Sequence, residues 1–212
     1  MRATSRSFEA NARAALKDAG LQRALARAKG GFIDKRRDAV AGLPEFESLR
    51  EVARDIKRHT LEHLDTYLLR FEAQVEEAGG LVHWARNAEE ANRIIVDICR
   101  QADARSVIKG KTMVGEETAI NPALERAGLD VVETDLGEYI IQLAKEPPSH
   151  IIAPAVHKSR ADVAALFAQH HHPDSEAAAS DAPEVLLNEA RRVLRGRFAA
   201  GDVGISALFK VS

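Results

Sequence analysis

Cysteine is almost absent from this sequence, which has a single thiol, Cys99, among its 212 residues. One thiol can form no disulfide within the chain, and it cannot by itself build a cysteine-based zinc or iron–sulfur site. Cys99 stands in the apolar segment ANRIIVDICRQA, so we expect a buried side chain that packs like a small apolar residue. The residues of this chain therefore predict no disulfide framework, no metal site and no cofactor of their own.

Long apolar runs and an excess of charge are also lacking. No run of about 18 apolar residues occurs, and the N-terminal segment MRATSRSFEANARAALKDAG lacks the apolar stretch of a secretory signal. The formal net charge is −2, from 30 basic and 32 acidic residues. These features predict a cytoplasmic globular protein and indicate neither a nucleic-acid partner nor a membrane partner.

Residues 1–79 are predicted to form a helical extension. From Ser7 onward this part is rich in alanine and charged residues, with breaks expected at 19–20, 30–31 and 42–44. Within 46–78, apolar residues recur at every third or fourth position, which predicts one long amphipathic helix. His59 and His63 have a spacing that can bind a metal on a helix face, but no third ligand accompanies them, so we interpret both as surface residues.

Residues 80–212 are predicted to form an α/β domain. Four short segments typical of strands each precede a helical pattern, namely 81–85, 106–110, 129–133 and 149–154. This alternation predicts a parallel sheet covered by helices. Asn121 and Ser159 are expected to cap two of these helices, and Gly128 is expected to end one. A polar connector, 170–183, then precedes a final amphipathic helix over 184–198.

Ligands bind outside the carboxyl ends of strands in open parallel sheets, so the loops after the predicted strands are the candidate site. Three loops qualify: 109–118, 133–138 and 154–160. We take as ligand-binding candidates the polar residues Lys109, Lys111, Thr112, Glu116, Glu117, Asp135 and His157. No catalytic residue can be assigned from spacing alone.

The tripeptide GKT at 110–112 is part of a P-loop motif, but that motif requires a glycine where this chain has Arg105, so we reject a nucleotide-binding P-loop. A lysine-bearing turn after a strand can still hold a small carboxylate or another anion. The alternative is that Lys109 and Lys111 pair with Glu116 and Glu117. The sequence favours neither reading.

Two further candidates have a structural alternative each. His157 follows a predicted strand and could act as a general base or bind a substrate, or it could be a helix-entry histidine with a local partner. Asp135 and Glu138 have the spacing of a capping box, in which Asp135 accepts from the first turn and Glu138 reaches back to the N–H of the cap residue. Asp135 also keeps a functional interpretation, because its loop faces the ligand edge.

Three motifs carry a family resemblance: KTMVGEE at 111–117, VETDLGEYIIQL at 132–143 and PSHIIAPAVHKSR at 148–160. On these motifs the chain resembles the lactate-utilization iron–sulfur proteins of the B type (LutB-like) and their LUD domain. The resemblance implies a three-layer α/β fold similar to the NagB/RpiA/CoA-transferase-like fold. It also implies a cytoplasmic component of a multi-protein iron–sulfur oxidoreductase that, together with other subunits, oxidises L-lactate to pyruvate.

The resemblance breaks down near the C-terminus. Members of the family continue into cysteine motifs that bind two [4Fe–4S] clusters, and this chain has none. We therefore expect a C-terminally truncated member, inactive on its own, whose incomplete sheet exposes an edge that favours homo-oligomers. Two other functions stay open: a transferase or isomerase-like binder of an acyl-CoA or sugar phosphate, and a non-catalytic assembly module that docks through the 46–78 helix.

Overall fold

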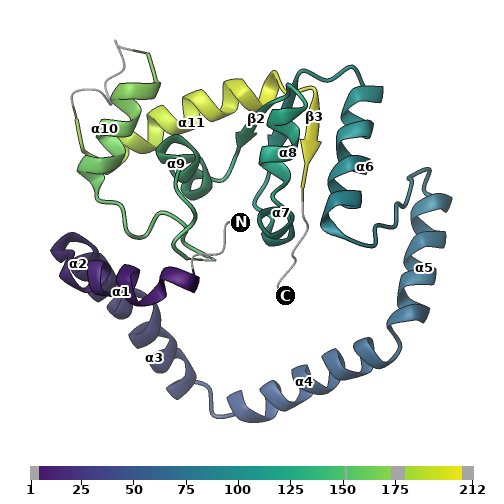
Figure 1. Cartoon of the computed structure of the whole chain (residues 1–212). Coiled ribbons are helices and arrows are strands. Elements are labelled where there is room, and N and C mark those ends of the chain that lie inside the picture. Colours follow the sequence, from purple (N-terminus) through teal and green to yellow (C-terminus); the bar gives the residue numbers. More distant parts are fainter. Residues whose placement is uncertain (1–4, 151, 173–179, 207–212) are drawn as a thin grey trace. The chain divides into compact units, whose positions relative to one another are not determined.

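A computed structural model describes residues 5–150, 152–172 and 180–206 (Figure 1). The contacts between Cα atoms divide the chain into two compact units, one of Arg27–Ala85 and one of Met1–Ala26 with Arg86–Ser212. The predicted domain boundary after residue 79 stays a prediction, because compactness of contacts does not test which part folds independently.

The N-terminal part is helical, as predicted. Its elements are a 3-10 turn (η1, Ser5–Ser7), α1 (Phe8–Lys17), α2 (Ala19–Ala28), a π-helical segment (η2, Lys29–Asp34) and α3 (Lys35–Ala41). The expected break at 30–31 is wrong, because the backbone there stays helical with the wider π pattern. The break around Pro44 is confirmed: it separates α3 from α4 (Phe46–Glu62).

The single long helix predicted over 46–78 is also wrong. The structure has two helices, α4 and α5 (Leu64–Glu77), separated at His63, whose φ of −120° and ψ of 28° leave the helical region. Thr60 Oγ1 donates to the carbonyl of Ile56 at 2.9 Å one turn earlier, a bond that often bends helices. Tyr67 OH and His59 Nε2, 3.1 Å apart, bridge the break.

A three-stranded parallel sheet lies at the centre of the second unit (Figure 1), and it confirms the α/β class. Its strands are β1 (Ser106–Lys109), β2 (Asp130–Glu133) and β3 (Val203–Ile205), in the order β2-β1-β3. Both strand pairs are parallel. The predicted strands at 106–110 and 129–133 are therefore confirmed, whereas β3 was not predicted.

The other two predicted strands are wrong as far as their residues are described. Residues 81–85 have no strand pairing, and Trp84 Nε1 donates to Glu72 Oε1 at 2.6 Å, which attaches the segment to α5. In 149–154, the backbone N–H and the hydroxyl of Ser149 both donate to the carbonyl of Pro154, so the segment closes on itself as a turn.

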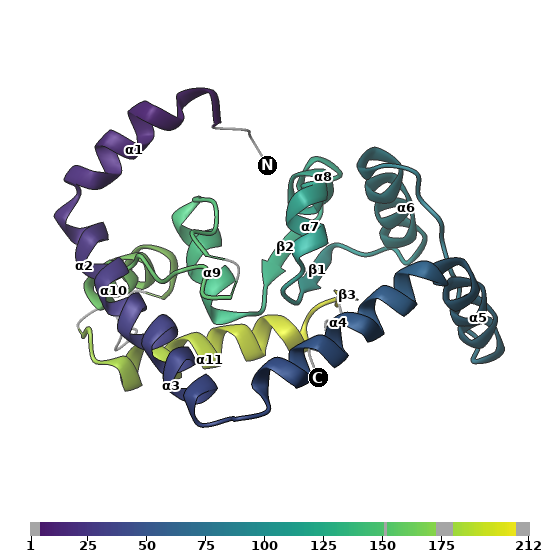
Figure 2. The same cartoon turned by 90° about the horizontal axis from the view of Figure 1, so that it is seen from below.

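Helices cover both faces of the sheet (Figure 2): α6 (Ala88–Gln101), α7 (Met113–Thr118) and α8 (Ile120–Arg126), then α9 (Leu136–Ala144), α10 (Arg160–His170) and α11 (Pro183–Ala199). Val107 and Val131 pack in one core cluster with Cys99 and Leu124. Val132 packs in a second cluster with residues of α9, α10 and α11. Because successive strand residues point to opposite faces, the result is three layers.

The cysteine and the helix ends test several local predictions. Cys99 is buried in the first cluster with 0% of its surface exposed, as expected, and this burial raises the pKa of its thiol. Ser159 caps α10 in a full capping box, and Gly128, at φ +85°, follows the end of α8. The predicted cap at Asn121 is wrong: α8 begins at Ile120, one residue earlier, after a left-handed residue.

The edge of β2 is covered by a side chain. Gln142 of α9 accepts from the backbone N–H of Glu133 at 3.1 Å and donates to the carbonyl of Val131 at 2.7 Å. These are the bonds that a further strand would make, so one amide side chain occupies this edge.

The final amphipathic helix is confirmed as α11, and most of the connector before it lies outside the described residues. Among the helices of the described part, none has the length and apolar character needed to cross a membrane.

Candidate functional site

A cavity of about 620 Å³ lies where the carboxyl end of β2 meets α7, α8 and α9. This volume falls within the roughly 300 to 1,000 Å³ of small-molecule sites. Its polar lining comes from Glu116, Asn121, Glu125, Glu133, Glu138, Gln142, Lys145 and Glu146. The place agrees with the rule that ligands bind beyond the carboxyl ends of parallel strands.

A buried ion pair joins the ends of the two neighbouring strands. In the parallel register Lys109 is the direct partner of Glu133, and each is the last residue of its strand. They point to the same face as Val107 and Val131, two positions earlier, and so both are enclosed: Lys109 is 0% exposed and Glu133 is 2% exposed. Lys109 Nζ lies 2.7 Å from Glu133 Oε1.

A third charge and an amide complete this cluster. Glu116 Oε1 lies 3.4 Å from Lys109 Nζ, and Asn121 Nδ2 donates to Glu133 Oε1 at 2.6 Å. Glu133 Oε2 and Asn121 Oδ1 are buried and have no hydrogen-bond partner among the described residues. Burial raises the pKa of the Glu133 carboxyl above its ordinary value, against the lowering effect of its bonds to Lys109 and Asn121. The site thus holds a carboxyl group that keeps a proton more readily than usual.

Lys111 makes a second, separate ion pair. Its ammonium contacts the carboxylate of Glu138, which is buried on α9. Glu138 therefore does not reach back to cap its own helix, and the predicted capping-box role of this residue is wrong. Asp135 does cap α9, accepting from the backbone N–H groups of Gly137 and Glu138 at 3.1 and 3.2 Å.

The remaining sequence candidates have local structural partners or none. Thr112 caps α7 by accepting from the N–H of Gly115 at 3.1 Å. Glu117 is exposed and does not line the cavity. His157 lies in a network with Ser149 Oγ at 2.8 Å and Glu146 Oε2 at 2.9 Å, which is the local-partner arrangement left open for it.

The sequence candidates are therefore only partly brought together. Lys109 and Glu116 meet in one cluster, and Lys111 lies in a neighbouring pair, whereas Asp135 and His157 have duties in the backbone and the loop. Sequence reasoning missed four residues that build the site: Asn121, Glu133, Glu138 and Gln142. For Glu133 a signal existed, because a charged residue stands in phase with buried Val131.

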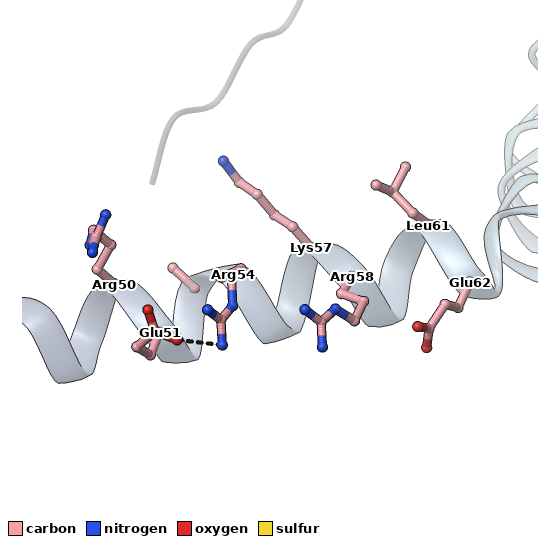
Figure 3. Close-up of a pocket in the computed structure, with 8 residues that line it drawn as sticks. Arg50, Glu51, Arg54, Lys57, Arg58, Leu61 and Glu62 are labelled. Atoms are coloured by element: carbon pink, nitrogen blue, oxygen red, sulfur yellow. Dashed lines mark ion pairs between the residues drawn. The ribbon is translucent and has the colours of Figure 1, made fainter.

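Two other hollows have less organised linings. One, of about 870 Å³, lies on α4, and Figure 3 shows Arg50, Arg54, Lys57 and Arg58 along it, with Glu51 paired to Arg54. All its lining residues come from this one helix, so no second element closes it. Another, of about 440 Å³, lies beside α11 and is mainly apolar. Within the described ranges, no group of three or more side chains could hold a metal ion.

The match to known proteins covers most of the chain. The LUD domain family model matches residues 68–209. The chain is 42% identical to lactate utilization protein B of Oceanobacillus iheyensis over 186 residues, which are 88% of this chain and 38% of that protein. It is 40% identical to lactate utilization protein B of an Exiguobacterium species over 199 residues, 94% of this chain and 42% of the relative. The Bacillus thuringiensis protein of the same name is 35% identical over 206 residues, 97% of this chain and 43% of that protein.

The chain thus spans about two fifths of the length of these relatives. No solved structure matches it. The family match runs through the whole cavity, from the turn after β1 to the loop before α10. On this match over more than half its length, the chain belongs to the LUD domain family and is a LutB-like member of it.

Proposed function

We propose that this chain is the LUD-domain portion of a lactate-utilization protein and takes part in the oxidation of L-lactate to pyruvate. The observation that carries the proposal is the similarity to proteins named lactate utilization protein B along 88% to 97% of the chain. The cavity at the carboxyl end of β2 supports a ligand-binding or positioning role for this portion.

Electron transfer in this proposal belongs to another part of the protein. Two [4Fe–4S] clusters are expected by resemblance, and each would need several thiolate ligands. The one thiol here, Cys99, is fully buried in the core and has a raised pKa, so it is unsuited to ligate a cluster. We place the clusters in sequence that this chain does not contain, the other lactate-utilization subunits as its partners, and the assembly in the cytoplasm.

A small carboxylate remains the proposed ligand of the turn that follows β1. Lys109 and Lys111 are the cations nearest to this turn, and both are held by carboxylates, Glu116, Glu133 and Glu138. An anion could bind there by displacing the carboxylate of Glu138 from Lys111, the more accessible of the two lysines. Lys109 is too deeply enclosed to make that exchange.

A domain exchange tests the proposed function. A bacterial strain that lacks its own lactate utilization protein B receives the Bacillus thuringiensis gene with its 206 matching residues replaced by this chain. We expect growth on L-lactate as sole carbon source to return, while growth on glucose is the same in all strains. The control strain carries the unaltered gene. A chimera that accumulates normally, retains its iron–sulfur absorption and still gives no growth on L-lactate would contradict the proposal.

A further inference from the structure

The cavity beside β2 contains acceptor atoms that the protein itself leaves without donors. Glu133 Oε2 and Asn121 Oδ1 are both buried, and both residues line the cavity. A buried acceptor without a hydrogen bond costs about 1 to 3 kcal/mol, so such atoms are rare in folded proteins and usually have a partner outside the chain. Two of them on neighbouring side chains, joined by the Asn121–Glu133 bond, point to one ligand.

The cavity wall is shaped by backbone that is unusual for its residues. Ala119 and Lys145 both line it and both adopt the left-handed conformation, at φ of 56° and 54°. Side-chain-bearing residues pay a steric cost there, and such conformations gather at binding and active sites. Ala119 sets the angle between α7 and α8, and so it fixes Glu116 against Asn121 across the cavity.

The charges around the cavity disfavour an anion. Five carboxylates line it, Glu116, Glu125, Glu133, Glu138 and Glu146, against one lysine, Lys145. The lysines that neutralise this group, Lys109, Lys111 and Lys158, contact the carboxylates but do not line the cavity. A ligand in the cavity therefore meets carboxylate and amide oxygens, and a carboxylate ligand would face repulsion from them.

We propose that this cavity binds a small organic ligand without negative charge, whose N–H or O–H groups donate to Glu133 Oε2 and Asn121 Oδ1. The site is distinct from the turn where an anion is proposed, and it goes beyond the role in lactate oxidation. An ammonium is the best donor for Glu133, because its charge complements the carboxylate. A neutral amide or hydroxyl provides the same hydrogen bonds without the charge.

Three probes of nearly equal size separate charge from shape: 1-amino-2-propanol is a cation, lactamide is neutral and L-lactate is an anion. Each is titrated into the purified chain while the backbone and side-chain amide resonances are followed by NMR. We expect the resonances of Asn121 and Gln142 to shift with the cation and with the amide, the cation binding at least tenfold more tightly than L-lactate. Millimolar affinity suits ligands of this size.

Variants of two glutamates locate the effect. Glu133→Gln keeps the shape of the side chain and removes its charge, so binding of 1-amino-2-propanol should weaken about tenfold, and binding of lactamide should weaken less. Glu125→Gln, at a cavity residue outside the Lys109 cluster, is the matched control and should leave the shifts of Asn121 unchanged. If Glu133→Gln does not fold, the order of the three probes on the unmodified chain still decides.

Three results would overturn the proposal. The first is L-lactate shifting the Asn121 resonances at the lowest concentration of the three probes. The second is no shift at Asn121 or Gln142 with any probe, which would mean that water alone meets these acceptors. The third is equal binding of the cation to the unmodified chain and to Glu133→Gln. Failure here leaves the growth experiment on L-lactate untouched, so the two proposals can fail separately.

Discussion

Two buried polar clusters of the α/β unit differ in how completely their hydrogen bonds are met. In one, beside the sheet edge, Lys109, Glu116, Glu133 and Asn121 leave two acceptor oxygens without partners. In the other, between α9, α10 and α11, His171 Nε2 lies 2.9 Å from Tyr139 OH and Nδ1 lies 3.1 Å from Glu189 Oε1. Glu189 in turn accepts from Arg192 through both its oxygens.

The second cluster is closed in every direction. The His171 ring stacks on Phe167 at 4.4 Å between centroids, and its side chain is 1% exposed. A fully satisfied network of this kind stabilises and orders the packing of its helices. The Lys109 cluster is equally buried but opens on a cavity with acceptors to spare. Equal burial thus serves packing in one place and favours binding in the other.

Removal of the lysine should have the largest effect on stability. Lys109→Met leaves the carboxylates of Glu133 and Glu116 buried without their cation, which costs about 3 to 5 kcal/mol when one partner of a buried pair is removed. We expect this loss in the free energy of unfolding, measured by urea denaturation monitored by circular dichroism.

The double variant Lys109→Met, Glu133→Gln tests the cause of that loss. With the Glu133 charge also removed, part of the stability should return, because the penalty of Lys109→Met is the unpaired charge rather than the lost packing. A double variant less stable than Lys109→Met alone would show that the cluster acts through packing, and the contrast between the two clusters would then fail.

Substitution in the satisfied network should have an intermediate effect. His171→Gln can keep one of the two bonds to Tyr139 and Glu189 but not the stacking on Phe167, so we expect a loss of about 1 to 3 kcal/mol at pH 7.5. Ligand binding in the cavity should be unchanged in this variant, as measured by the same NMR titration. Weakened binding would mean that the two clusters are coupled.

The same variant tests a pH dependence of known sign. Burial lowers the pKa of His171, helped by Arg192 and His170 and opposed by Glu189. Above the unfolded value of about 6.5, both states are neutral. As the pH falls below it, the unfolded chain takes up a proton first, so the free energy of unfolding should decrease toward acid pH. His171→Gln should flatten this decrease between pH 7.5 and 5; an unchanged slope would exclude His171 as its source.

The sequence predicted the local structure better than the pairing of distant residues. The strands ending at Lys109 and Glu133, the end of α9 at Ala144 and the cap at Ser159 follow from runs of β-branched residues, capping residues and prolines, which act over a few positions. The ion pair between Lys109 and Glu133 depends on the strand register, which no local pattern contains. The family resemblance gave the class of the fold but not this cluster.

The wrong predictions have physical reasons of the same kind. Residues 81–85 have the composition of a strand, but a strand exists only where another pairs with it, and here Trp84 is held by Glu72. The short strand β3 has a glycine at its centre and so gives a weak signal. The break at His63 interrupts an unbroken apolar period without proline or glycine, so periodicity predicted one helix.

The smallest effect should come from Asp135, and it bears on both clusters at once. Asp135 caps α9, the helix that carries Glu138 and Gln142 to the cavity and Tyr139 to the His171 network. Asp135→Ala should cost about 1 kcal/mol of unfolding free energy, the usual cost of a lost N-cap.

Asp135→Asn keeps the cap and removes the charge, because asparagine is an equally good N-cap residue. If Asp135 is structural, Asp135→Asn should keep both the stability and the growth on L-lactate of the exchanged protein. Loss of growth with unchanged stability would instead give the Asp135 carboxylate a direct role in the reaction. The acidic residue that ends the turn after β2 would then belong with the unsatisfied cluster rather than with the framework that holds both clusters in place.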